Sequence, residues 1–473
     1  MKKYYDIAII GGGTVGSMIF LDAVSRGFSC VLIEKNKVGL GTNKASLGLI
    51  QTGLNYLYKD RDFVWMNAID SEFINHILGD FLKRKRFLIP IFSGSKYPLW
   101  LWDGYLAAYD QFRKSNHPDH RLLSKKETLF KEPFLKKEVN GGAMFCEWTT
   151  DPVLLTKAVV KTGQMLGGEL LEGAEAREAF SETRNNISNI RYLRIKQNEI
   201  FRWIEASLFI NAAGPWTPKV LSETFSVAPI ETRLTKGVSI VVRKRFTNSA
   251  VVLFDESHKY IAVLPLSRRK TLIGPTNTDI DENLKNDPQK VQAEKREISE
   301  LINIVRRYFK IKIAENLICE IRAGLRPQLA HKKAAPDRIS HDFMIIDHEK
   351  RDKISNLITV FGGKLSNQVR MAKETVDLAS LKLGCKRLWQ MPFLKITKEK
   401  ASKTYSKESF KFLNLYQKKY ALSYNDDINK IAWRKKIKAV WRLLPFLIYG
   451  LWQNFIKKLK GAIKCRKTRL KTN

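Results

Sequence analysis

The chain has few cysteines, and they are too scattered to form a recognisable site. Five cysteines occur among 473 residues, and no two form a C-x-x-C pair. Closely spaced cysteines are what zinc sites and disulfide frameworks require. The sequence therefore predicts no metal site and no disulfide framework, and it favours a reducing compartment.

Long hydrophobic runs are also absent. The apolar stretch Leu443–Trp452 is 10 residues long, about half of the roughly 20 residues that a membrane-spanning helix needs. Met1-Lys2-Lys3 and the apolar residues after them resemble the start of a signal peptide. However, the run passes into three glycines without a small-residue cleavage pattern. We therefore expect no spanning helix and interpret the first apolar run as a strand.

Acidic residues are missing from the last part of the chain. Residues 431–473 contain 13 Lys or Arg and no Asp or Glu, which is more than a third of the formal net charge of +36. Trp433, Trp441 and Trp452 lie among these cations, a combination typical of the membrane headgroup region. We predict an amphipathic helix here that binds an anionic membrane surface. Packing on the body of the protein is the first alternative, and nucleic-acid binding is the least favoured one.

What the sequence does contain is a strand–turn–helix–strand unit from Asp6 to Glu34. An apolar strand leads into Gly11, Gly13 and Gly16, which have the G-x-G-x-x-G spacing. These glycines allow a tight turn, close approach of a pyrophosphate and close packing of the following helix. Glu34 lies about 20 residues beyond them, where an acid can bind a ribose 2′-hydroxyl. The unit predicts a dinucleotide site and favours NAD or FAD over NADP.

Further strands and helices are indicated along the chain. Asp151-Pro152 opens a helix that runs to Gly167, and Leu208–Asn211 is a buried strand that ends at Ala213-Gly214. Val64–Phe87 has a helical pattern. Leu357–Phe361 is an apolar strand that runs into Gly362-Gly363-Lys364 and then a helix.

Several motifs beyond the first turn resemble those of one family. They are Gly41–Ser46 with Gly53–Leu57, Asn211–Trp216, Lys236-Gly237, Leu272–Asp279, Gly324–Pro327 and Phe361–Leu365. Together they resemble the FAD-dependent glycerol-3-phosphate dehydrogenases, within the wider family of flavin oxidases that includes the D-amino-acid oxidases. The similar stretch extends from about Tyr4 to Gly384.

The resemblance implies an α/β fold: a Rossmann-like FAD-binding domain interleaved with a substrate domain built on a mixed or antiparallel sheet. We expect the discontinuous FAD-binding domain at residues 1–90, 150–225 and 320–388, and the substrate domain at 91–149 and 226–319. Residues 389–473 form the basic, helical C-terminal extension.

The resemblance also implies which residues line the cofactor. Glycines near the flavin would let backbone amides approach its ring. The expected FAD-binding residues are Gly11, Gly13, Gly16, Glu34, Thr42, Ala45, Ser46, Ala176, Ala213, Gly214, Gly324, Gly363, Lys364 and Leu365.

Cations are the main substrate candidates. Arg326, held in a turn by Pro327, can offer two parallel donors to a phosphate or carboxylate, and Lys364 can act as a point charge. His258 is the candidate base. We expect catalytic roles for Arg326, Lys364 and His258, and substrate binding by Asn55, Lys236, Arg322 and Arg326.

The sequence departs from the family pattern at four positions, all in substrate motifs. Gln51 and Asn55 stand where the dehydrogenases usually have histidine and arginine, and Ser239 stands where part of the family has histidine. Gln368 occupies a position near the family's arginine, and Arg370 is displaced from it by one place. One residue on a helix rotates a side chain by about 100°, so Arg370 is not expected to substitute.

We therefore predict an FAD-dependent dehydrogenase that oxidises sn-glycerol 3-phosphate to dihydroxyacetone phosphate and passes electrons to a quinone-type acceptor. It would be cytoplasmic and peripheral on the inner face of the membrane. Two alternatives stay open: a related flavoenzyme for another hydroxy or amino acid, and a non-catalytic basic FAD-binding protein, with RNA as one partner. A homodimer also stays open.

Overall fold

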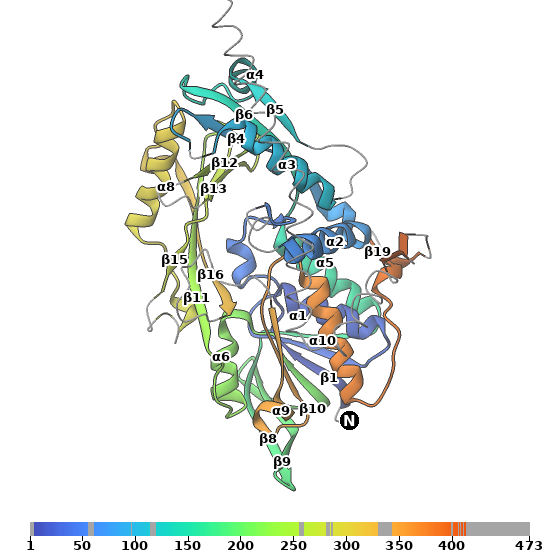
Figure 1. Ribbon diagram of the computed structural model, residues 1–473. Helices are drawn as coiled ribbons and strands as arrows, with labels where there is room; N and C mark the ends of the chain where they lie inside the picture. Colours follow the sequence, from blue (N-terminus) through green and yellow to red (C-terminus); the bar gives the residue numbers. More distant parts are fainter. Residues whose placement is uncertain are drawn as a thin grey trace, which may run out of the picture.

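The structure consists of two sheets with helices packed on them (Figure 1). It is a computed structural model that describes residues 4–54, 61–95, 97–113, 120–254, 260–280, 284, 287–329, 343–398, 401–404, 406, 408–409 and 411–412. The molecule is elongated, with the β8–β9 ribbon (Ala174–Arg184 and Ile187–Gln197) at one end and helix α4 (Lys125–Lys131) at the other.

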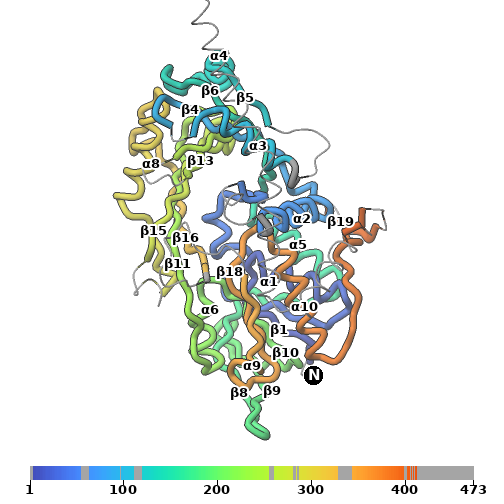
Figure 2. The backbone as a smooth tube through the Cα atoms, viewed as in Figure 1, coloured from blue at the N-terminus to red at the C-terminus, as the bar shows by residue number. Residues whose placement is uncertain are grey.

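The first sheet is built around parallel strands. Its order is β17-β18-β10-β1-β2-β7, and β8 and β9 extend from β10. β1 pairs in parallel with β10 and β2, β10 with β18, and β2 with β7, whereas β17 is antiparallel to β18. The bounds are β1 Tyr4–Ile10, β2 Cys30–Glu34, β7 Glu169–Glu172, β10 Ile200–Asn211, β17 Phe343–Asp347 and β18 Leu357–Gly362. Figure 2 shows the late strand β18 running into the fold of the early chain.

Helices from distant parts of the sequence cover one face of this sheet. They are α1 (Thr14–Ser25), α2 (Arg61–Leu78), α5 (Pro152–Met165) and α10 (Gln368–Lys382), and their buried residues share one core cluster. The predicted start of α5 is confirmed, because the Asp151 carboxylate accepts hydrogen bonds from the amides of Val153 and Leu154 at 3.0 and 3.1 Å. The other face is covered by the β8–β9 ribbon, the short helix α6 (Thr217–Lys219) and the π-helical turn η5 (Val220–Thr224).

The second sheet is mostly antiparallel. Its order is β15-β11-β14-β13-β12-β4-β6-β3, with β16 paired to β11 and β5 paired to β6. The bounds are β3 Leu49–Ile50, β4 Leu82–Phe92, β5 Arg121–Ser124, β6 Val139–Thr150, β11 Thr232–Val242, β12 Ala250–Phe254, β13 Tyr260–Pro265, β14 Thr271–Gly274, β15 Thr278–Asp279 and β16 Ile318–Leu329.

Two core clusters cover the two faces of this second sheet. One includes Trp102 and Leu106 of α3 (Leu99–Arg113), and the other includes Leu301 and Val305 of α8 (Lys295–Tyr308). The remaining elements are the helix α9 (His348–Asp352), the short turns η1 (Thr42–Ala45), η3 (Gly79–Phe81), η4 (Gly214–Trp216), η6 (Pro288–Lys290), η7 (Glu315–Leu317) and η8 (Met391–Phe393), and the small sheet of β19 (Leu394–Ile396) and β20 (Ala401–Lys403).

The predicted fold class is confirmed, whereas several predicted limits need correction. The helix expected at Val64–Phe87 ends at Leu78, and β4 begins at Leu82 because its cations alternate along an extended strand. β4 and β16 both lie in the second sheet, so the boundaries predicted near residues 90 and 320 fall inside strands. We propose boundaries before β4 and after β16 instead.

The first part of the predicted extension packs on the body. Trp389, Met391, Leu394, Ile396 and Phe412 belong to the same core cluster as α1 and α10. The predicted membrane-interface helix lies outside the described residues. Within the described ranges, no helix is long and apolar enough to cross a membrane.

Candidate active site

The glycine turn lies between the end of β1 and the start of α1. Gly11 has φ +107°, and a Cβ atom there would lie 2.6 Å from the carbonyl oxygen of Ala212. A Cβ atom at Gly16 would lie 1.9 Å from the carbonyl oxygen of Gly11, so the helix can pack this closely only on glycine. At Gly13, by contrast, no atom lies within 4 Å of a Cβ position. The turn therefore leaves open space at the glycine that a pyrophosphate approaches in this fold.

Glu34 lies at the end of β2, directly beside this turn. Its Oε2 accepts a hydrogen bond from the amide of Gly12 at 2.7 Å, and its Oε1 accepts one from Asn36 at 2.8 Å. The neighbouring Lys35 forms an ion pair with Glu175 at 2.8 Å, which brings the start of β8 with Ala176 alongside. The structure thus groups Glu34 and Ala176 near the glycine turn.

The bend after β10 completes this side of the site. The amide of Ala212 donates to the carbonyl of Ile10 at 2.9 Å, and the amide of Ala213 donates to the Asn211 side chain at 3.2 Å. Gly214 adopts φ +58°. Ala213 and Gly214 consequently lie beside the turn, at the carboxyl ends of parallel strands, where ligands bind in open α/β sheets.

The turn η1 connects the two sheets. Asn43 accepts a hydrogen bond from Thr14 of α1 at 2.7 Å. On the other side, a Cβ atom at Gly324 of β16 would lie 2.5 Å from Cβ of Ala45. Only glycine allows β16 to approach η1 this closely. Thr42, Ala45 and Ser46 therefore lie between the dinucleotide turn and the second sheet.

The segment after β18 contains a glycine pair and a group of buried polar atoms. Gly362 and Gly363 have φ of +85° and +81°, and the amide of Lys364 donates to the Asn367 side chain at 2.7 Å. Within the described residues, Oγ of Ser366, Nδ2 of Asn367 and Nε2 of Gln368 are buried without a hydrogen-bond partner. Buried polar atoms are normally hydrogen-bonded. These atoms, at the start of α10, fit the polar edge of a bound cofactor.

Arg326 is held from two sides on β16. Its guanidinium donates to the Asn277 side chain and to the carbonyl of Thr276, both at 3.0 Å. It lies over Gly237 of the paired strand β11, where a Cβ atom would come within 2.2 Å of the guanidinium. Asn277 and Gly237 therefore define where this cation points.

Lys364 and Arg326 lie close enough to influence each other. The Nζ atom of Lys364 is buried, and it lies 5.1 Å from the ring centroid of Phe63. Burial, and next the charge of Arg326, lower the pKa of Lys364 well below its ordinary value. Two cations this close together in a buried place favour an anion between them.

Two predicted substrate residues lie elsewhere. Lys236 faces away from Arg326 on β11 and forms ion pairs with Glu294 and, at 3.0 Å, with Glu297. Burial lowers the pKa of Lys236, but these hydrogen bonds outweigh it and raise the pKa. Arg322 shares the face of Arg326 but pairs with Glu320 at 2.7 Å. His258 and Asn55 lie outside the described residues.

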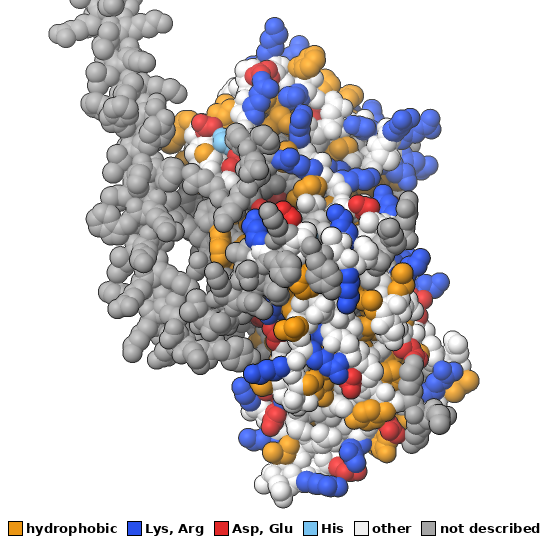
Figure 3. All heavy atoms as spheres, turned by 90° about the vertical axis from the view of Figure 1, so that its right-hand side faces the viewer, with side chains coloured by type: hydrophobic (Ala, Val, Ile, Leu, Met, Phe, Trp, Pro, Cys, Tyr) orange, Lys and Arg blue, Asp and Glu red, His pale blue; other side chains and the backbone are white. Residues whose placement is uncertain are grey.

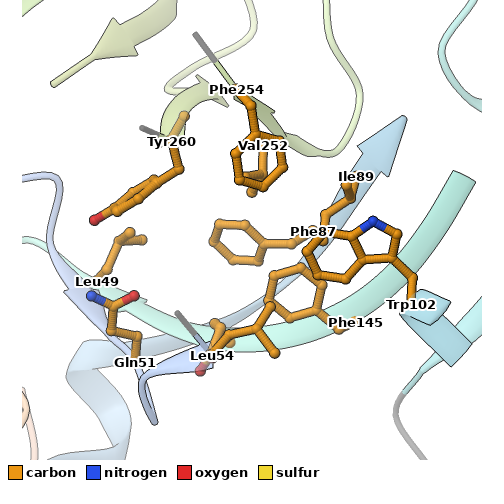
Figure 4. A pocket seen from close by; sticks show the side chains of 12 residues that line it. Leu49, Gln51, Leu54, Phe87, Ile89, Trp102, Phe145, Val252, Phe254 and Tyr260 are labelled. Carbon is orange, nitrogen blue, oxygen red and sulfur yellow. The ribbon is translucent and has the colours of Figure 1, made fainter. Parts of the chain in front are cut away.

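An apolar pocket opens on the second sheet (Figure 4). Most of its wall is aliphatic or aromatic, with Phe87, Phe145, Phe254 and Trp102 among the lining side chains. The polar ends of Gln51 and Tyr260 lie together at the side away from Trp102. The sequence motifs did not reveal this pocket, because its walls come from six separate segments.

Sequence comparisons agree with this architecture. The profile of the family "DAO: FAD dependent oxidoreductase" matches residues 6–366. The aerobic glycerol-3-phosphate dehydrogenase of Staphylococcus aureus (strain USA300) is 30% identical over 384 residues, which are 80% of this chain and 67% of that protein.

Solved structures give the same result. The glycerol-3-phosphate dehydrogenase of Bacillus halodurans, complexed with FAD, superposes with a TM-score of 0.63 at 25% identity, covering 82% of this chain and 66% of that one. The L-alpha-glycerophosphate oxidase of Mycoplasma pneumoniae shares the fold, with a TM-score of 0.60 at 21% identity over 82% of this chain and 98% of that one. The chain spans about two thirds of the length of the two dehydrogenases.

The open turn at Gly13, the acid at Glu34 and the polar atoms at the start of α10 all fit FAD, as the family requires. The chain belongs to the DAO family and is an FAD-dependent oxidoreductase.

Proposed function

We propose that this enzyme oxidises sn-glycerol 3-phosphate to dihydroxyacetone phosphate. The proximity of Arg326 and Lys364 carries the proposal, because two cations in a buried place suit a small anionic substrate. Bound FAD supplies the hydride acceptor. The names of the relatives indicate which anion to test first.

The roles of the two cations follow from their surroundings. Arg326, fixed by Thr276 and Asn277, binds the anionic group of the substrate. Lys364 has a lowered pKa and therefore holds a neutral amine more readily than an exposed lysine does. A neutral amine beside the substrate hydroxyl can take its proton as the C–H bond breaks. Lys364 thus becomes our preferred base, in place of His258.

A second candidate is oxidation of another hydroxy or amino acid. It is favoured by the loss of the family's arginine at Asn55. Arg370 does not supply the missing charge, because its Nε donates to Asp70 at 3.0 Å and ties α10 to α2. A non-catalytic FAD-binding role is the third candidate, and the retained Arg326 and Lys364 argue against it.

The proposal is tested by anaerobic mixing of the purified yellow protein with glycerol 3-phosphate and a panel of small hydroxy and amino acids. Bleaching by glycerol 3-phosphate supports the first candidate, and bleaching by another compound alone supports the second. A flavin that no compound bleaches would leave the non-catalytic role.

We also propose that the enzyme is a peripheral membrane protein on the cytoplasmic side that delivers its electrons to a quinone. The 13 cations of residues 431–473 leave a formal charge of +23 on the rest of the chain. On the face in Figure 3, Lys and Arg side chains outnumber Asp and Glu over the described surface. Each cation near an anionic leaflet contributes about 1 kcal/mol to binding. Binding to anionic vesicles should disappear on truncation after Asp427, and unchanged binding would refute the role of the tail.

A further inference from the structure

The pocket of Figure 4 shares a face of the second sheet with Arg326. Arg326 lies opposite Thr235 on β11, and alternate residues of β11 lead along the same face to Val241. The register then continues across the sheet through the pairs Val241–Leu272, Leu272–Leu264 and Ala262–Val252. Ala262 and Val252 line the pocket. The anion site and the apolar pocket are therefore two regions of one continuous surface.

The chemistry of the pocket does not suit the proposed substrate. Glycerol 3-phosphate is polar along its whole length, whereas the pocket wall is mostly aliphatic and aromatic. Burying hydroxyl or phosphate groups against such a wall costs free energy without compensation. A dehydrogenase has a second ligand, however, which is the electron acceptor.

A quinone ring matches the pocket in both of its properties. Its flat apolar ring suits walls such as Phe87 and Phe145, whose ring centroids lie 5.4 Å apart in a stacked arrangement. Its carbonyl oxygens need hydrogen-bond donors, and the Gln51 amide and Tyr260 hydroxyl lie together at one side (Figure 4).

The opposite side of the pocket is bordered by exposed aromatic residues. Trp102 of α3 contacts Phe254, with ring centroids 6.1 Å apart, and it contacts Tyr97 at the same distance. Tyr97 is 41% exposed and Trp100 is 50% exposed. Exposed tryptophan and tyrosine are typical of the membrane–water interface. The start of α3 therefore offers an apolar route from a bilayer to the pocket.

We propose that this pocket binds the ring of a membrane quinone, which enters past Tyr97 and Trp100 and is oriented by Gln51 and Tyr260. The inference rests on the proposed function. Oxidation of one secondary alcohol to a ketone releases two electrons and two protons. Reduction of one quinone to its hydroquinone takes up the same two electrons and two protons, the protons going to its two oxygens.

The test separates the two half-reactions of the FAD-loaded protein. Bleaching by glycerol 3-phosphate without oxygen reports the donor site, and re-oxidation by a short-chain benzoquinone reports the acceptor site. Ala262→Leu, which fills the pocket, should raise the KM for the quinone about tenfold, the loss of about 1.4 kcal/mol, while the bleaching rate stays unchanged. Tyr260→Phe should raise it about fivefold. The matched control Tyr192→Phe, on the exposed ribbon, should change neither.

Binding is measured independently of turnover. The benzoquinone should quench tryptophan fluorescence saturably, and Trp102→Phe should remove most of that quenching. Replacing Tyr97 and Trp100 by serine should slow re-oxidation by a long-chain quinone in vesicles but not by the short-chain one.

Three results would overturn the inference. They are an unchanged quinone KM in Ala262→Leu, quenching that Trp102→Phe leaves intact, or re-oxidation by oxygen with no saturable quinone reaction. In each of these cases normal bleaching would preserve the proposed function. If no substrate bleaches the flavin, the proposed function fails, and this inference fails with it.

Discussion

The guanidinium of Arg326 and the ammonium of Lys364 come from different sheets and meet in one buried place, where the charge of Arg326 helps to lower the pKa of Lys364. Neither cation gains stability from the other. Such an arrangement is costly for a folded protein unless an anion binds there. The substrate site proposed here follows from this relationship.

Replacing Arg326 should disable the substrate site and spare the cofactor. Truncating one partner of a buried, hydrogen-bonded charge pair costs about 2–5 kcal/mol, so Arg326→Ala should slow flavin bleaching by glycerol 3-phosphate at least about thirtyfold. Bound FAD should stay near one per chain. Arg233→Ala, which removes an arginine paired with Asp279 on β11, is the matched control. Near-normal bleaching in Arg326→Ala would remove this residue from the site.

Replacing Lys364 should exchange activity for stability. Burial disfavours the charged ammonium in the folded state, so the unfolded chain binds more protons between the lowered pKa and the ordinary value. Stability contributed at this position is therefore lowest at low pH and rises with pH across that window. Lys364→Met should raise the melting temperature at low pH, with a gain that shrinks as the pH approaches the ordinary lysine pKa. A gain independent of pH would contradict this account.

The same variant tests the role of Lys364 as a base. If Lys364 takes the hydroxyl proton, wild-type kcat/KM should rise with pH through the lowered pKa of this lysine. Lys364→Met should lose that rise together with most of the activity. A pH profile of unchanged shape in the residual activity would assign Lys364 to anion binding alone.

The ion pair between Asp70 and Arg370 should contribute to stability and not to catalysis. Both side chains are buried, and the pair joins α2 to α10. Removing one partner of a buried pair costs about 3–5 kcal/mol, so Asp70→Ala should lower the urea midpoint sharply. The double variant Asp70→Leu with Arg370→Met should recover much of the loss. If Arg370→Met instead weakened substrate binding in a stable protein, Arg370 would belong to the substrate site.

The cofactor turn can be tested by single methyl groups. Gly16→Ala would place a Cβ atom 1.9 Å from the carbonyl oxygen of Gly11, which forces the turn apart. The purified variant should be colourless. Gly104→Ala is the control, because no atom lies within 4 Å of that position in α3. Retention of FAD by Gly16→Ala would show that the turn does not hold the cofactor.

Local sequence patterns were sufficient for the nucleotide half of the fold. The strand before Gly11, the helix after Asp151 and the strand before Gly362 are each specified by adjacent residues, and the structure confirms them. The second sheet could not be derived in this way. Its strands pair across long stretches of chain, so the positions of β4 and β16 depend on partners that no local pattern names.

The substrate half shows the same limit at the level of side chains. Lys236 and Gly237 are adjacent in sequence, but alternation along β11 turns Lys236 toward Glu297 and leaves Gly237 beneath Arg326. The sequence also marked Asn277 as part of a motif without revealing that it orients Arg326. Which residues of a motif share a face becomes clear only from the pairing register.

The most direct test of the central claim is anaerobic titration of the purified holoprotein with glycerol 3-phosphate. The account predicts that the yellow flavin absorbance disappears in the wild type, persists in Arg326→Ala, and returns when a quinone is added. A wild-type flavin that stays oxidised at saturating glycerol 3-phosphate would contradict it.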